Sequence, residues 1–142
     1  MKHINRLMVA ALVTAGLQLA ACQKEHAAHQ AEHPAEVKKI EGTDLSQVIL
    51  TERAAQRLDV RTDQVREQGA KKVIPYSSLI YDMNGQTWVY TNPEPRTYVR
   101  SKVNVDYIKG ETAFLNDGPP AGTAIATVAV AELYGTEFKV GH

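Results

Sequence analysis

The sequence predicts a small, mainly antiparallel β domain of the α+β class, a sheet or β-roll with one short helix. It follows a signal peptide and a flexible tether. Residues 97–108 alternate apolar and polar side chains, the period of a strand with one solvated face. Asn84-Gly85 lies between two β-branched runs and is a strong hairpin signal. Short apolar runs separated by turn residues fill residues 45–137, which we assign to one domain.

The domain begins with a strand followed by its single helix. Val48-Ile49-Leu50 is a short apolar run typical of a buried strand. Thr51 is a suitable N-cap, and Glu52 is favourable at the positive end of a helix, so we expect a helix over residues 52–58. The chain then returns to an extended pattern over residues 59–65.

A hairpin comes next. Residues 71–81 are apolar and β-branched, and Pro75 marks an edge or a bend because proline cannot donate to a β ladder. Residues 87–91 form the returning strand, in which Trp88 and Tyr90 share one face.

Three further strands complete the domain, with a turn at residues 92–95. We expect strands over residues 97–108, 111–115 and 123–130. Residues 131–134 are expected to form a closing turn, and residues 138–142 a mobile tail.

Composition excludes several classes of protein. The chain has 142 residues, with 16 Lys+Arg and 16 Asp+Glu, so its formal net charge is zero. This balance argues against nucleic-acid binding through bulk positive charge. The single cysteine excludes an internal disulfide and a cysteine-rich zinc site.

The first 21 residues have the features of a signal peptide. Lys2 and Arg6 precede an apolar run from Leu7 to Ala21, which is too short for a permanent membrane span. The run ends in Leu-Ala-Ala-Cys22, which resembles a bacterial lipobox. This resemblance implies lipidation of Cys22 and anchoring in the cell envelope, facing the periplasm. An ordinary signal peptide followed by a chance cysteine is the alternative. Gln23 after the cysteine favours the outer over the inner membrane, by resemblance to enteric lipoproteins.

Residues 22–44 are polar and alanine-rich, and we predict that they form a lipidated tether. His26, His29 and His33 would share one face if this segment were helical. Imidazole is a good ligand for copper or zinc, so metal binding is one interpretation. The other is a soluble tether that happens to contain histidine, because ordering a flexible site costs entropy.

The predicted scaffold shows no catalytic signature. All five histidines lie in the signal peptide, the tether or the last residue, so a His-dependent mechanism is not expected. We therefore expect no enzymatic activity. A small basic and aromatic patch could bind a partner, or could be an ordinary solvated strand face; it comprises Arg96, Tyr98, Arg100 and Lys102.

The order of these features resembles the periplasmic adaptor subunits (membrane fusion proteins) of resistance-nodulation-division (RND) efflux pumps, over residues 48–137. The elements that carry the resemblance are Val48–Thr62, the run Val73–Ile80, Trp88-Val89-Tyr90, the valines Val103 and Val105, and the glycines Gly85, Gly110, Gly118 and Gly122. In the family, a glycine usually stands where this chain has Asp59.

The resemblance implies that the chain is a free-standing membrane-proximal domain. Complete adaptors insert a lipoyl-like domain, usually a helical hairpin, and a β-barrel between two segments that residues 65–71 join directly here. The implied function is that of a non-enzymatic accessory or docking module, with RND transporter or adaptor subunits as partners. The alternative is a copper- or zinc-binding lipoprotein that uses the three histidines of the tether.

Overall fold

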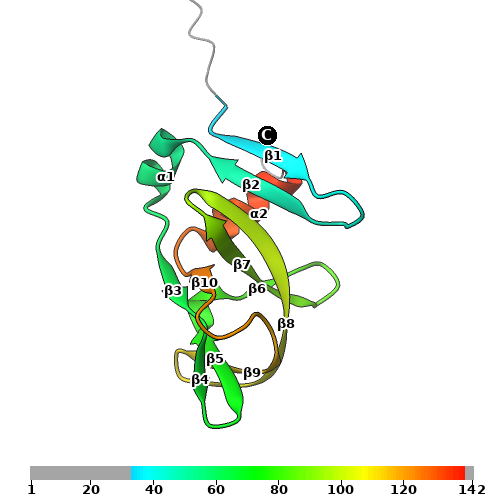
Figure 1. The fold of residues 1–142 in the computed structure, drawn as a ribbon, viewed down its shortest axis with the longest axis vertical. Helices are drawn as coiled ribbons and strands as arrows, with labels where there is room; N and C mark the ends of the chain where they lie inside the picture. The colour runs from blue at the N-terminus through cyan, green and yellow to red at the C-terminus, as the bar shows by residue number, and fades with distance from the viewer. Residues whose placement is uncertain (1–32, 140–142) are drawn as a thin grey trace, which may run out of the picture. The chain divides into compact units, whose positions relative to one another are not determined.

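The computed structural model describes residues 33–139, which form a mainly antiparallel β domain with two short helices. The predicted fold class is confirmed, although it included one helix rather than two. Ten strands form one nearly closed, barrel-like sheet (Figure 1). The elements are β1 (Ala35–Lys39), β2 (Ser46–Leu50), α1 (Glu52–Leu58), β3 (Thr62–Gln64), β4 (Arg66–Gln68), β5 (Lys71–Pro75), the 3-10 turn η1 (Tyr76–Ser78), β6 (Ile80–Tyr81), β7 (Thr87–Glu94), β8 (Thr97–Lys109), β9 (Thr112–Asp117), β10 (Ala124–Ala126) and α2 (Val130–Phe138).

The barrel closes because β3 and β4 are two halves of one extended segment. The strand order runs β3-β10-β7-β8-β9-β5-β4, so the two ends of the path are joined by Val65 alone. The Val65 amide donates to the Thr123 carbonyl at 2.9 Å, and the Gly122 amide donates to the Val65 carbonyl at 2.7 Å. The barrel encloses a core of aliphatic side chains: Val65, Ile74, Val89, Val103, Ala113, Leu115 and Ile125.

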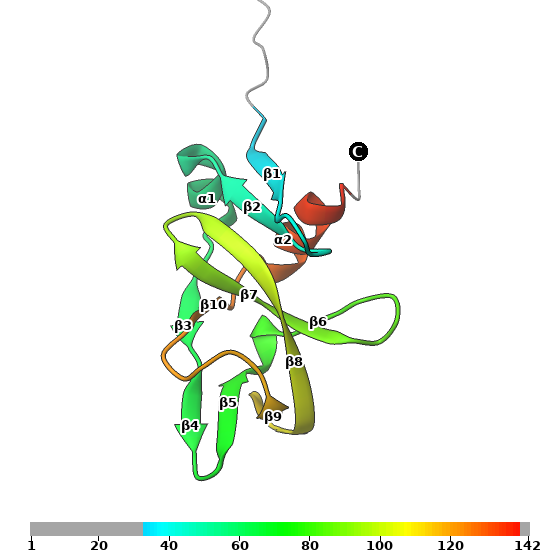
Figure 2. The ribbon, with the colours of Figure 1, turned by 45° about the vertical axis from the view of Figure 1, so that its right-hand side comes forward.

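A second core lies where α1, α2 and the β1–β2 hairpin cover the first half of β8. β2 pairs with β8 through Val48 and Tyr98, and α2 packs against β2, β7, β6 and β1. Its buried members are Val48, Leu50, Ala54, Tyr90, Tyr98, Ala126, Val130 and Leu133. Figure 2 shows this end of the domain, and also the β6–β7 hairpin extending to the side of the barrel.

Local signals predicted α1 and the turn of the β6–β7 hairpin correctly, but of the expected arm over residues 71–81 only β6 pairs with β7, whereas β5 pairs with β9. The Thr51 hydroxyl accepts from the Ala54 amide at 3.2 Å, which caps α1 as expected. In the hairpin, the Asp82 carboxylate accepts from the Asn84 and Gln86 amides, and Gly85 has the left-handed φ of 74° that this turn needs.

The predicted tether is wrong from Ala35 onward, because residues 35–39 form β1 and belong to the domain. β1 pairs along its whole length with β2, from Ala35 opposite Leu50 to Lys39 opposite Ser46. The segment has few apolar residues, so its strand conformation depends on pairing with a distant neighbour rather than on its own composition.

The C-terminal predictions need a second correction. The expected strand over residues 123–130 is only β10, and the expected closing turn belongs to α2, which continues to Phe138. Leu133 is completely buried in the second core, so tertiary packing selects the helix here. The domain therefore begins before residue 45 and ends after residue 137, the limits that the sequence predicted.

Candidate functional site

The structure divides the four residues of the predicted basic and aromatic patch. Arg96 is exposed in the turn before β8, with φ of 61°, and Lys102 is exposed farther along β8. Tyr98 and Arg100 are only 5% and 6% exposed. Both interpretations of this strand face, a partner-binding patch and a solvated surface, are therefore wrong for Tyr98 and Arg100. The reason is that α2 covers this part of the sheet, which the period of β8 alone could not show.

Arg100 is the centre of a buried charged cluster between β7, β8 and α2. Its Nε donates to Oε2 of Glu137 at 2.7 Å, and the Tyr90 hydroxyl donates to the same oxygen at 2.6 Å. The guanidinium carbon lies 4.5 Å from the ring centroid of Trp88 and 4.7 Å from that of Phe138. We call these five residues the Arg100 cluster. The positive charge of Arg100 is therefore stabilised by the Glu137 carboxylate and by the faces of two aromatic rings.

The electrostatics of this cluster favour one position of α2. The Arg100 and Glu137 side chains are 7% and 2% exposed, so both charges are removed from water. Burial, and then the hydrogen bond to Glu137, raises the pKa of Tyr90 well above its usual range. A buried pair contributes little net stability, but separating its partners is costly. The cluster therefore fixes the last turn of α2 over β7 and β8.

The second oxygen of Glu137 has a different environment. Oε1 is buried and has no hydrogen-bond partner among residues 33–139. Glu137 also lines a cavity of about 200 Å³ between the β1–β2 hairpin and the end of α2, together with Val37, Asp44 and Ser46. A polar cavity of this size can hold several water molecules. Within the described residues, no serine, histidine or cysteine bonds to this carboxylate, so the cluster offers no nucleophile–base pair.

An aromatic surface lies on the outer face of the opposite half of the barrel. Ile74, Ala113 and Leu115 point into the barrel core, so alternation turns their neighbours outward. Tyr107 of β8 stacks on Phe114 of β9 with ring centroids 4.4 Å apart. We call the following residues the aromatic surface, although Val73 and Phe114 are themselves only 9% and 8% exposed: Val73, Pro75, Tyr76, Tyr107 and Phe114.

The aromatic surface has the composition of a protein contact area. Tyr76 is 46% exposed and Tyr107 is 47% exposed. A hollow of about 710 Å³ lies beside Val73, Pro75 and Tyr76, with Arg66 and Glu111 at its margin. Aromatic groups inside a charged rim are typical of protein–protein interfaces.

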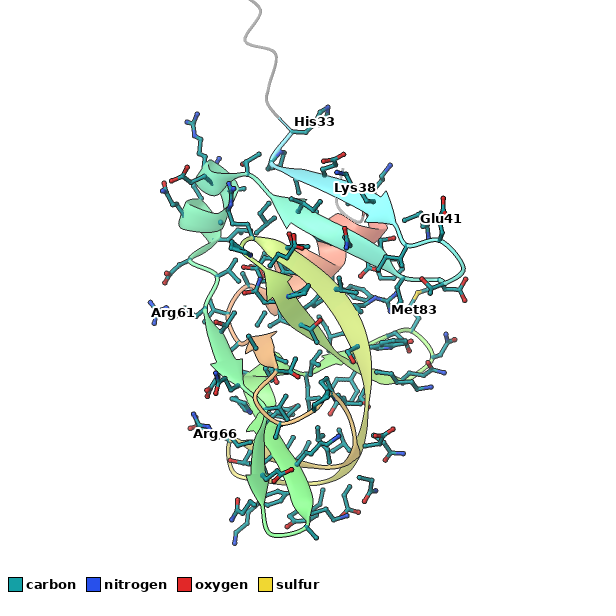
Figure 3. All side chains as sticks on the ribbon, viewed as in Figure 1. His33, Lys38, Glu41, Arg61, Arg66 and Met83 are labelled. Carbon is teal, nitrogen blue, oxygen red and sulfur yellow. The ribbon has the colours of Figure 1, made fainter. Side chains whose placement is uncertain are left out.

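The predicted lipid and metal sites fall mostly outside the described part of the chain. Cys22, His26 and His29 lie outside residues 33–139. His33 is exposed just before β1 (Figure 3). Within the described residues, no group of three or more His, Cys, Asp or Glu side chains is placed to hold a metal ion. Lipidation at Cys22 and metal binding by the three histidines stay predictions.

Sequence reasoning missed Glu137, although its spacing carried a signal. Val130, Leu133 and Glu137 are separated by three and four residues, which puts them on one face of a helix. All three are buried. An acidic residue in phase with two apolar ones indicates a buried charge that needs a cationic partner.

Comparisons of the chain with protein-family models, with curated proteins and with solved structures found no match. Neither helix of residues 33–139 is long and apolar enough to cross a bilayer.

Proposed function

We propose that this protein is a lipid-anchored, non-enzymatic docking module of a bacterial envelope transport complex, related in design to the membrane-proximal domain of RND efflux adaptors. One observation carries the proposal. The two segments that resemble the family on either side of residues 65–71 share a single sheet, since β2 pairs with β8 and β3 pairs with β10. In the family, these two segments come together as the membrane-proximal domain.

Two local features support the same assignment. Asp59, where the family usually has glycine, adopts a left-handed conformation with φ of 48° and ψ of 46°, the region that glycine occupies most easily. The connection that would carry the inserted domains of a complete adaptor is here a β4–β5 hairpin turning at Gly69. The path of the sheet from β4 to β5 is therefore continuous without an inserted domain, as the proposal requires.

In this proposal, the N-terminal segment anchors the protein and the β domain contacts its partners. Acyl groups on Cys22 would hold the protein in the envelope, with the outer membrane favoured, and the domain would face the periplasm. The aromatic surface would contact transporter or adaptor subunits, because it combines exposed tyrosines with a hollow and a charged rim.

Site-specific photo-crosslinking in cells tests this proposal. A photoreactive amino acid replaces Tyr107 on the aromatic surface, and in a matched control it replaces Gln56 on the exposed side of α1. We expect a discrete product with a transporter or adaptor subunit from the first site only, and loss of that product when Cys22→Ser prevents anchoring. The same products from both sites, or no envelope transport protein among them, would overturn the proposal.

A further inference from the structure

β1 has an unpaired edge on the outside of the domain. It pairs with β2 on one side only, and within residues 33–139 no other strand lies against its second side. The other strands with a free edge, β3, β4 and β6, have three, three and two residues, whereas β1 has five. Figure 1 shows the β1–β2 hairpin at one end of the domain. An open edge of this length can accept another strand.

The hydrogen bonds at the two ends of the hairpin show which backbone groups face outward. The Thr51 amide donates to the Pro34 carbonyl, and the Ile40 amide donates to the Leu45 carbonyl, each at 3.0 Å. Hydrogen-bonded pairs alternate along an antiparallel ladder, so Glu36 and Lys38 also bond to β2. The amides and carbonyls of the intervening residues point to the free edge; these residues are Ala35, Val37 and Lys39.

These outward groups restrict how a second β1 could pair antiparallel to the first. Only registers that place outward residues opposite each other form hydrogen bonds. With Val37 opposite Val37 of the second copy, Ala35 lies opposite Lys39, and all the outward groups are used. This register therefore has three hydrogen-bonding residue pairs: Val37 with Val37, and Ala35 with Lys39 in both directions. Shifting one strand by two residues in either direction leaves only two such pairs.

The side chains select the same register. Glu36 and Lys38 are on the exposed face of β1, where their charged groups are 3.3 Å apart within one chain. In the register centred on Val37, Glu36 of each copy lies directly opposite Lys38 of the other. The two shifted registers instead put Glu36 opposite Glu36, or Lys38 opposite Lys38. Opposite charges across strands stabilise a pair and like charges destabilise it.

We propose that β1 is a self-association edge, which pairs with β1 of a second copy around a two-fold axis through Val37. The resulting sheet runs β2-β1-β1-β2, with the Val37 side of both hairpins on one face. Figure 3 shows the Lys38 side chain at the surface of β1, available for this cross-strand contact. The inference uses only the backbone and charges of β1, and it does not depend on the proposed function.

Cysteine crosslinking of the full chain in detergent micelles, without any transport protein, tests the geometry. Val37→Cys places two thiols on the axis, with Cα atoms about 5.5 Å apart, a separation that a disulfide spans. Lys39→Cys is the matched control, because its counterpart in the second copy is about 14 Å away, four residues along the strand. We expect disulfide dimers from Val37→Cys, and from a mixture of Ala35→Cys with Lys39→Cys, above the level of the unmodified chain. Equal dimer formation by Val37→Cys and Lys39→Cys would overturn the proposal.

Charge exchange tests the register independently. Glu36→Lys and Lys38→Glu should each weaken self-association about tenfold, because both cross-strand contacts become repulsive. Mixing these two variants should restore association, whereas Glu41→Lys in the adjacent turn should leave it unchanged. In the unmodified chain, dimerisation should slow hydrogen exchange at the amides of Ala35, Val37 and Lys39. Failure of the mixture to associate, or exchange independent of protein concentration, would show that β1 is only a protected edge.

Discussion

Neutralising Glu137 should destabilise the domain far more than an exposed carboxylate would. In Glu137→Gln the side chain keeps its shape, but Arg100 remains buried at 7% side-chain exposure without a negative partner. Removing one member of a buried ion pair costs about 3–5 kcal/mol. Because glutamine still offers a carbonyl oxygen to Arg Nε and to Tyr90, we expect about 3 kcal/mol. For a domain with a total stability of about 5–15 kcal/mol, this is a large fraction.

Chemical denaturation followed by tryptophan fluorescence measures this loss, since Trp88 belongs to the Arg100 cluster and is the only tryptophan. The melting temperature should fall by about 12 °C, at about 4 °C for each kcal/mol. Glu132→Gln on the exposed side of α2 is the control, with an expected loss below about 1 kcal/mol from the helix dipole. The double variant Arg100→Met with Glu137→Met should regain most of the stability, because it removes both buried charges. If Glu137→Gln and Glu132→Gln were equally stable, the reasoning about the buried pair would be refuted.

Three other predictions concern different parts of the chain. The raised pKa of Tyr90 means that the folded state holds its phenolic proton more tightly than the unfolded state, so this stability is present below pH 10.0 and is lost as the pH rises above that value. Tyr90→Phe should therefore flatten the alkaline fall in unfolding free energy and cost about 2 kcal/mol at neutral pH. A profile that keeps its slope in this variant would contradict the prediction. Gly118→Ala would place a methyl group 3.0 Å from a Leu115 side-chain carbon and 3.2 Å from one of Val103. We expect a loss of about 1–3 kcal/mol in thermal unfolding, and an unchanged melting temperature would show that the barrel yields there. Calorimetry with Cu²⁺ and Zn²⁺ tests the interpretation that the histidines of the N-terminal segment bind metal. Binding should disappear when alanine replaces His26, His29 and His33. Unchanged metal affinity in this variant would reject the interpretation.

Features with a local cause could be predicted from the sequence. Thr51 caps α1 because its hydroxyl meets an amide three residues away, and Asn84-Gly85 turns a hairpin because the backbone there needs a positive φ. The alternation along residues 97–108 similarly predicted β8, including the buried position of Val103.

Features with a distant cause could not be predicted in this way. β1 is a strand because β2 pairs with it, and α2 is a helix because Leu133 fills the second core, although Gly135 lowers its intrinsic propensity. The burial of Arg100 depends on Glu137, which is 37 residues away in the sequence. The period of a strand shows which side chains share a face, but not what later covers that face.

Closure of the barrel by β10 sets the order in which this protein can be assembled. β10 supplies the pairing for β3, and α2 follows it directly, so both cores are completed only after residues 124–138 have been synthesised. A nascent chain that has reached only Gly118 exposes the edges of β3 and β7 and lacks the carboxylate for Arg100. Such an intermediate is vulnerable to aggregation, because unpaired edges and apolar surface remain open. The domain therefore folds only after β10 and α2 have been made, and truncation before Ala124 should yield insoluble protein.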